Sequence, residues 1–167
     1  ATNAVLVPIS DFPSSHAALA RVAAEHRRNP DLVVHLLNVR RPLSGRVVRL
    51  VRRSLRYDYY REKGALALAP AREILDRQRI PYQAHVLVGH AAELIAEEAK
   101  RLRCDRIVMS TARRGSITRL LEDSTTERVL HETEVPVELI VSDQASALER
   151  YALPAAIAAL GAAIVAA

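Results

Sequence analysis

Cysteine is almost absent from this sequence, since Cys104 is the only one. The chain therefore cannot form an intrachain disulfide or build a metal site from several cysteines. Tryptophan is absent and aromatic residues make up only 4% of the chain, so aliphatic side chains must fill the core. Lysine occurs only at Lys63 and Lys100, so arginine carries nearly all of the positive charge behind the net +5. That charge favours affinity for anions but does not indicate specific nucleic-acid binding.

The first residues also lack the features of a secretory signal. Residues 1–7 contain neither a basic stretch nor a long apolar run, so we expect a cytoplasmic location. Half of the residues are hydrophobic and 26% are charged, as in ordinary globular proteins. A length of 167 residues is enough for one domain with a substantial core.

Five short apolar runs, separated by helical patterns, predict a parallel sheet. The runs occupy residues 5–9, 32–39, 82–88, 105–109 and 135–141, with Pro136 at the start of the last one. Most of them show little alternation, which is typical of strands buried on both faces. Strands and helices that alternate along the chain favour right-handed crossovers. We therefore predict one α/β domain over residues 1–145.

An arginine-rich segment follows the second predicted strand. Arg46, Arg49, Arg53 and Arg56 recur at helical spacing, with Val48, Val51 and Leu55 on another side, so a short basic amphipathic helix is predicted. It either contacts an anionic partner, such as a membrane surface or a nucleic acid, or is a solvated connecting helix. The second interpretation is favoured because no aromatic residues alternate with the arginines. Residues 60–78 are predicted to form another helix, kinked or restarted at Pro70.

The last residues have a different composition. Residues 146–167 are predicted to form an extra apolar helix, and the part from Tyr151 to Ala167 has no charged side chain. This run is shorter than the about 20 apolar residues of a membrane span, and much of it is alanine. We expect it to pack on the domain or on a partner subunit. The alternative is that this run is part of a membrane segment, so that the chain would be the soluble module of a membrane-associated protein.

Several other groups of reactive side chains give weak signals. His85 and His90 flank a strand end, but no third residue has metal-ligand spacing, so a structural role is expected. Cys104 precedes a buried strand and is expected to be a small core residue. Asp11, Ser14, Ser15 and His16 are too close in sequence to adopt the geometry of a catalytic triad. The sequence therefore predicts neither a metal site nor a catalytic site.

Three segments in order resemble the universal stress protein family. Residues 5–19 resemble its first strand and helix start, Val88–Gly89 resembles its third strand-to-helix turn, and residues 107–141 resemble its last two strands with the helix between them. The resemblance implies a Rossmann-like, doubly wound, five-stranded parallel sheet of order 3-2-1-4-5. It also implies a homodimer formed through the last strand, with the following interface candidates: Pro136, Val137, Glu138, Leu139, Ile140 and Val141.

The resemblance also implies a nucleotide cleft, but its glycine loop is altered. The three glycine positions of nucleotide-binding members fall on Ser110, Arg113 and Asp123, and only the Ser124 that follows them matches. The aspartate that ends the family's first strand is replaced by Ser10. The candidate cleft residues are Pro8, Ile9, Ser10, Asp11, Val39, Met109, Ser110, Ala112, Arg113, Arg114, Asp123, Ser124 and Thr125.

These replacements predict weak or absent ATP binding. Asp123 would stand where the terminal phosphates lie, and like charges about 4 Å apart repel by about 4 kcal/mol at an intermediate dielectric. Ser124 and Glu127 instead match a capping box. We therefore expect a non-catalytic stress-response interaction protein with no cofactor, an unidentified protein partner and no specific nucleic acid. The alternative is an ATP-binding switch or slow ATPase, with Arg113, Arg114 and Ser124 as phosphate donors.

Overall fold

The computed structural model describes residues 3–10, 16–112 and 124–142. Within these ranges the chain forms a five-stranded parallel sheet of order β3-β2-β1-β4-β5. The strands are β1 (Ala4–Pro8), β2 (Val33–Arg40), β3 (Tyr82–Val88), β4 (Arg106–Ala112) and β5 (Val137–Ser142). The predicted α/β class and the predicted strand order are both confirmed.

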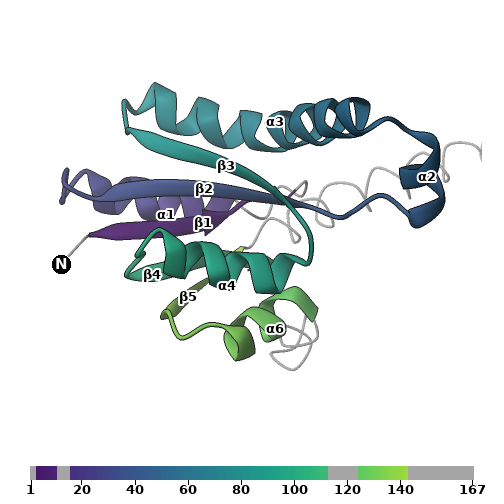
Figure 1. The fold of residues 1–167 in the computed structure, drawn as a ribbon. Helices are drawn as coiled ribbons and strands as arrows, with labels where there is room; N and C mark the ends of the chain where they lie inside the picture. Colours follow the sequence, from purple (N-terminus) through teal and green to yellow (C-terminus); the bar gives the residue numbers. More distant parts are fainter. Residues whose placement is uncertain (1–2, 11–15, 113–123, 143–167) are drawn as a thin grey trace, which may run out of the picture.

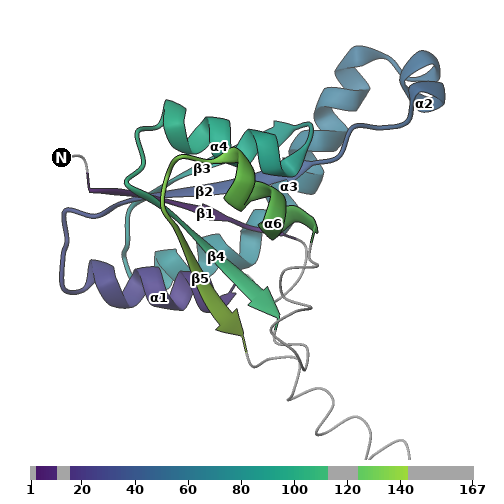
Figure 2. The same cartoon turned by 90° about the horizontal axis from the view of Figure 1, so that it is seen from below.

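Helices cover both faces of the sheet (Figures 1 and 2). The helices are α1 (His16–His26), α2 (Gly45–Leu50), α3 (Arg53–Arg77), α4 (Ala91–Arg101) and α6 (Ser124–Glu132). The helices α1 and α3 pack on one face, and α4 and α6 pack on the other. The arrangement is therefore doubly wound, as the crossover rule for parallel strands requires.

The central strand β1 explains why the apolar runs show so little alternation. Val5 and Val7 are fully buried in the cluster under α1 and α3, whereas Ala4 and Leu6 are buried in the cluster under α4 and α6. A strand covered by helices on both sides needs apolar side chains at every position. Since aromatic residues are scarce, leucine, isoleucine, valine and alanine supply nearly all of this core.

The helices between β2 and β3 differ from the prediction. The break falls at Val51 and Arg52, whose ψ angles of 129° and 145° are extended, and α3 then continues unbroken through Pro70. Pro70 removes one helical hydrogen bond, but it lies on the exposed side of α3, where water can reach the carbonyl of Leu66. None of the residues in α2 is buried, so no tertiary packing holds residues 46–56 in one straight helix.

Two strand ends also differ from the prediction. The strand β4 continues through Ala112, so Ser110 lies in a strand and not in a loop. The strand β5 begins at Val137, and Pro136 lies just before it, where its carbonyl accepts the Ile107 N–H at 2.8 Å. A proline has no N–H to donate to a sheet, which is consistent with its place at the strand start.

The predicted apolar helix over residues 146–167 lies outside the described residues. Within residues 3–10, 16–112 and 124–142, no helix combines the length and the apolar character needed to cross a bilayer.

Candidate functional site

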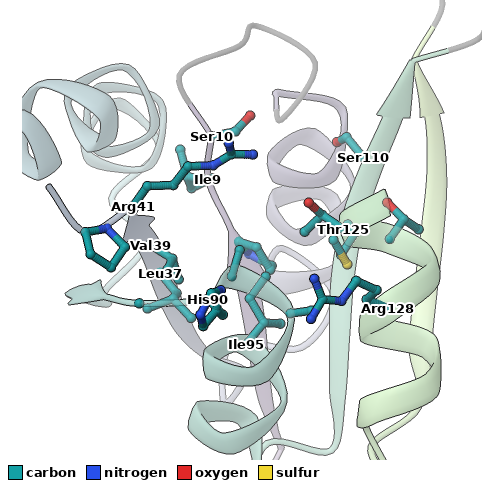
Figure 3. Close-up of a pocket in the computed structure, with 17 residues that line it drawn as sticks. Ile9, Ser10, Leu37, Val39, Arg41, His90, Ile95, Ser110, Thr125 and Arg128 are labelled. Carbon is teal, nitrogen blue, oxygen red and sulfur yellow. The ribbon is translucent and has the colours of Figure 1, made fainter. Parts of the chain in front are cut away.

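A cavity of about 760 Å³ lies at the carboxyl ends of β1, β2 and β4, next to the first turns of α4 and α6 (Figure 3). Leu37, Val39 and Met109 supply apolar surface from the sheet, and Ile95 supplies more from α4. The strand order changes direction between β1 and β4, and ligands of doubly wound proteins bind at such a point. The fold therefore places an open space where this class of protein holds its ligands.

Hydrogen bonds between β1 and β2 position the chain at the edge of this cavity. The Ile9 N–H donates to the Leu37 carbonyl at 2.8 Å, and the buried Asn38 amide donates to the Ile9 carbonyl at 2.8 Å. These two hydrogen bonds extend the pairing of β1 with β2 to Ile9, one residue beyond the end of β1. Ile9 and Ser10 consequently line the cavity in a fixed position.

The first turn of α4 opens into the cavity. Its N-cap residue, His90, makes no side-chain capping bond, and Ala91 and Ala92 line the cavity. Gly89 precedes it with a φ of 158°, and a Cβ at this position would lie 2.8 Å from the Leu94 side chain. The positive φ therefore favours glycine, and a larger residue would have to displace the end of the Leu94 side chain. Backbone N–H groups at an uncapped helix start can serve as donors to a ligand.

Three basic side chains border the cavity. Figure 3 shows Arg41, from the connection after β2, and Arg128, from α6, reaching toward the space from opposite sides, with His90 below Arg41. The Arg128 guanidinium lies 3.7 Å from Glu93, a loose and half-exposed pair. Such a pair holds its arginine weakly, so Arg128 can turn toward an anion in the cavity.

Ser110 links β4 to α1. Its Oγ accepts a hydrogen bond of 2.8 Å from the Ala18 N–H, which is one of the first N–H groups of α1. These groups have no partner within their own helix, so the serine acts as a cap supplied by a distant strand. Ser110 also lines the cavity, and its hydroxyl hydrogen can still donate to a ligand.

Seven of the thirteen predicted cleft residues line this one cavity. They are Pro8, Ile9, Ser10, Val39, Met109, Ser110 and Thr125. Ala112 ends β4 and Ser124 begins α6. Asp11, Arg113, Arg114 and Asp123 lie outside the described residues.

The sequence analysis did not identify the basic side chains of the cavity as site residues. Arg41 directly follows the last residue of β2, and His90 directly follows the recognised turn at Val88–Gly89. Both residues could therefore have been predicted as site residues from the sequence. Arg128 lies inside the pattern of an ordinary amphipathic helix, and only its place in the fold brings it to the cavity.

A second polar cluster lies away from the cavity, between the sheet and α4. His35 Nδ1 and His85 Nε2 are 3.2 Å apart, His85 Nδ1 is 3.6 Å from a Glu98 oxygen, and Arg101 Nε donates to Glu98 at 2.8 Å. Burial lowers the pKa of both histidines, and for His35 the neighbouring His85 adds to the effect. The hydrogen bond from Arg101 lowers the pKa of Glu98. The cluster therefore favours neutral histidines beside an ionised glutamate.

Within this cluster His85 contacts His35 and Glu98, which the sequence spacing between His85 and His90 did not indicate. No group of three or more histidine, cysteine or acidic residues in the described part of the chain is arranged to hold a metal ion. Burial raises the pKa of Cys104 to about 11, with Asp105 and Glu98 adding to the effect, so its thiol stays protonated at neutral pH.

A doubly wound parallel sheet with a cavity at the change in strand order defines a Rossmann-like α/β domain. Within that class, residues 2–141 match the sequence model of the universal stress protein family, and the chain therefore belongs to this family. The predicted family is thus confirmed. No curated protein matches the chain.

Solved structures of family members share this fold at low sequence identity. A universal stress protein from Lactobacillus plantarum has a TM-score of 0.65 and 19% identity, over 83% of this chain and 97% of that chain. One from Arabidopsis thaliana, solved with AMP bound, has values of 0.59 and 21%, over 84% and 92%. A universal stress protein in complex with cAMP has values of 0.63 and 16%, over 83% and 96%. At these identities the likeness establishes the fold alone.

Proposed function

We propose that this chain is a non-catalytic stress-response protein that binds ATP weakly or not at all. The hydrogen bond from Ala18 to Ser110 carries the proposal. Position 110 corresponds to a glycine of the family's nucleotide loop, where bare backbone approaches the phosphates. Here a side chain fills that position and holds the start of α1. A rearrangement that brought phosphate against this backbone would have to displace the serine.

The sequence beyond the described residues supports the same proposal. Arg113 and Asp123 occupy the other two glycine positions, and their structure lies outside the described ranges. A carboxylate beside the terminal phosphates would repel them, and a helix start that is capped by the protein's own side chains has fewer N–H groups to offer.

The chemistry of the cavity supports binding and not hydrolysis. The lining side chains contributed by the described residues include hydroxyls, two arginines and His90, but no aspartate or glutamate. A hydrolase of this type needs a group that orients or deprotonates the attacking water, and among the described lining residues only His90 could accept its proton. The arginines instead favour the binding of anions.

Titration calorimetry with ATP and magnesium tests the proposal directly. We expect no measurable heat of binding, or a dissociation constant weaker than millimolar, together with no phosphate release above the rate of buffer alone. A micromolar constant for ATP would overturn the proposal. Steady phosphate release that is lost in a Thr125→Ala variant would instead support the slow ATPase.

A second candidate function is recognition of a nucleoside monophosphate. Arg41 and Arg128 reach toward the cavity from opposite sides, which suits a small ligand with one phosphate group. The bound AMP and cAMP of two family members motivate the choice of ligand. Calorimetry with AMP and with cAMP tests it, and binding should be lost in an Arg41→Ala/Arg128→Ala double variant. Unchanged binding in that variant would contradict it.

We also propose that the chain forms a homodimer through β5. This strand is last in the order β3-β2-β1-β4-β5, and Leu139 is 38% exposed on it. An edge strand with exposed apolar side chains favours pairing with another chain. A Leu139→Lys variant should sediment as a monomer, whereas Leu130→Lys, at an equally exposed leucine of α6, should not. A wild-type monomer at micromolar concentration would refute the dimer.

A further inference from the structure

The chain between β2 and the middle of α3 projects from the domain. We call residues 40–63 the basic arm. None of its residues is buried, and the first buried residue after it is Gly64. A Cβ at position 64 would lie 2.5 Å from a Val86 methyl carbon, so close packing of α3 on the sheet begins only there. Figures 1 and 2 show α2 extending beyond the strands, at the far end of α3.

The arm is nevertheless an ordered unit. The Tyr60 hydroxyl accepts a hydrogen bond of 2.7 Å from the Leu43 N–H, which joins the connection before α2 to α3. The Lys63 ammonium lies 5.9 Å from the ring centre of Tyr59, within the range of a cation–π contact. The first contact ties the connection before α2 to α3, and the second lies within α3, so the arm presents a defined surface.

Positive charge is concentrated in the basic arm. It holds eight arginines and Lys63 against only Asp58 and Glu62, for a net charge of +7. The whole chain has a net charge of +5, so the remaining residues together carry −2. The arginines at 46, 49, 52, 53 and 56 form no ion pair with any described residue. The arm is therefore a localised cationic surface, and the charges of these five arginines are not neutralised within the described structure.

Apolar side chains are exposed among these charges. Leu50 is 87% exposed, Leu55 is 58% exposed and Tyr57 is 67% exposed. Val47 and Tyr59 are also exposed. Leucine at such exposure is unfavourable in water, and burying it in an apolar layer recovers that free energy. The arm thus combines attraction to anions with a set of side chains that favour a hydrocarbon environment.

We propose that the basic arm binds the surface of an anionic phospholipid bilayer. Basic side chains near such a surface are attracted by its negative potential, and leucine and tyrosine enter the boundary between headgroups and acyl chains. A nucleic acid would pair with the arginines equally well, but its backbone offers no apolar layer to Leu50 and Leu55. The aliphatic side chains therefore favour the membrane. The sequence from Tyr151 to Ala167 has no charged side chain, and its apolar residues would also favour a hydrocarbon environment.

Cosedimentation of the full chain with vesicles tests this proposal. Binding to vesicles of phosphatidylcholine with phosphatidylserine should be strong, and binding to phosphatidylcholine alone should be at least tenfold weaker. A triple variant, Arg46→Glu/Arg49→Glu/Arg53→Glu, should lose at least tenfold in affinity for the mixed vesicles. Its control is Arg27→Glu/Arg28→Glu/Arg72→Glu, with the same charge change at exposed positions outside the arm, which should bind like the wild type. Equal binding by both triple variants would overturn the proposal.

A second variant separates the membrane from a nucleic acid. Leu50→Ser/Leu55→Ser keeps every charge, so it should weaken vesicle binding severalfold and leave binding to a DNA duplex unchanged. Wild-type binding to the duplex that exceeds vesicle binding, with no effect of the serines on either, would overturn the proposal in favour of a nucleic acid. Vesicle binding that is lost only when residues 151–167 are deleted, and not in either arm variant, would also overturn it.

Discussion

Polar side chains pair with one another at the amino end of the sheet, whereas several of them border an open cavity at the carboxyl end. At the amino end, the Asp105 carboxylate accepts the Ala4 N–H at 2.8 Å, and the nearby Glu98 is paired with Arg101 and His85. At the carboxyl end, Arg41, His90 and Arg128 border an open cavity, and the one ion pair that they form with described residues, Arg128 with Glu93, is 3.7 Å long. Polar groups that satisfy one another contribute to stability, whereas polar groups held apart are available to a ligand. The first end should therefore be sensitive to mutation in stability, and the second in binding.

The largest effect is expected from Glu98→Ala at the amino end. Glu98 is only 4% exposed, and its removal takes the acceptor from Arg101 and the neighbour from His85. We expect a loss of about 2–3 kcal/mol in the free energy of unfolding, measured by urea denaturation. Glu97→Ala, at the exposed neighbouring position, should cost less than about 0.5 kcal/mol. Equal losses in the two variants would show that the buried network does not stabilise the fold.

A dependence of stability on pH should come from the same network. Burial lowers the pKa of His35 and His85 below the ordinary value of 6.5, so the unfolded chain binds more protons than the folded chain just below that pH. Stability should be full above about pH 6.5 and should fall by about 1 kcal/mol per pH unit as the pH drops toward the folded pKa values. The lowered pKa of Glu98 adds a further loss below its unfolded value of 4.5, as the pH falls through the folded value.

Urea denaturation at about pH 7.5 and at about pH 5.5 measures this slope. A His35→Gln/His85→Gln variant should lose most of the slope between these two pH values, whatever its stability at neutral pH. His90→Gln, at the exposed position beside the cavity, should keep the slope of the wild type. A double variant with the wild-type slope would show that other groups set the acid sensitivity.

The sequence predicted the fold because burial on both faces leaves a direct local signal. The runs around Val5, Leu36 and Val108 are apolar at successive positions, and together with the helical patterns between them they indicated a parallel sheet. The strand order came from the family resemblance. The break between α2 and α3 left no such signal, since it falls among exposed residues where packing imposes no periodicity. Pro70 was a misleading signal, because it lies on the solvent side of α3.

The candidate site was predictable only where the family resemblance supplied it. Ser10 was placed by matching the end of the family's first strand, and Ser110 and Thr125 by matching its loop. All three line the cavity. Nothing in the sequence indicates that Arg128 faces Arg41, because the two residues belong to distant elements that meet only in the folded chain. The same is true of His35 and His85, which are fifty positions apart along the chain and 3.2 Å apart in space.

A smaller effect is expected from Ser110→Ala, because Ser110 both borders the cavity and stabilises the fold. Ser110 lies at the cavity, yet its Oγ serves stability by accepting the Ala18 N–H. Its loss should cost about 1 kcal/mol in the free energy of unfolding, as for other helix-capping serines. Ser54→Ala, at an exposed serine of α3, should change stability by less than about 0.5 kcal/mol. A neutral Ser110→Ala would remove the main support for weak ATP binding.

The smallest effect on the ligand-free protein is expected from Arg41→Ala/Arg128→Ala. Arg41 is exposed and the pair of Arg128 with Glu93 is loose, so the double variant should unfold within about 0.5 kcal/mol of the wild type. If AMP occupies the cavity, a ligand concentration of about 100 times Kd should stabilise the wild type by about 2.7 kcal/mol and leave the double variant unchanged. Thermal unfolding with and without AMP measures both quantities in one experiment. A loss of unfolding free energy in the ligand-free double variant as large as that of Glu98→Ala would show that polar groups at the carboxyl end also stabilise the fold. Equal stabilisation of both proteins by AMP would show that the two arginines do not hold the phosphate.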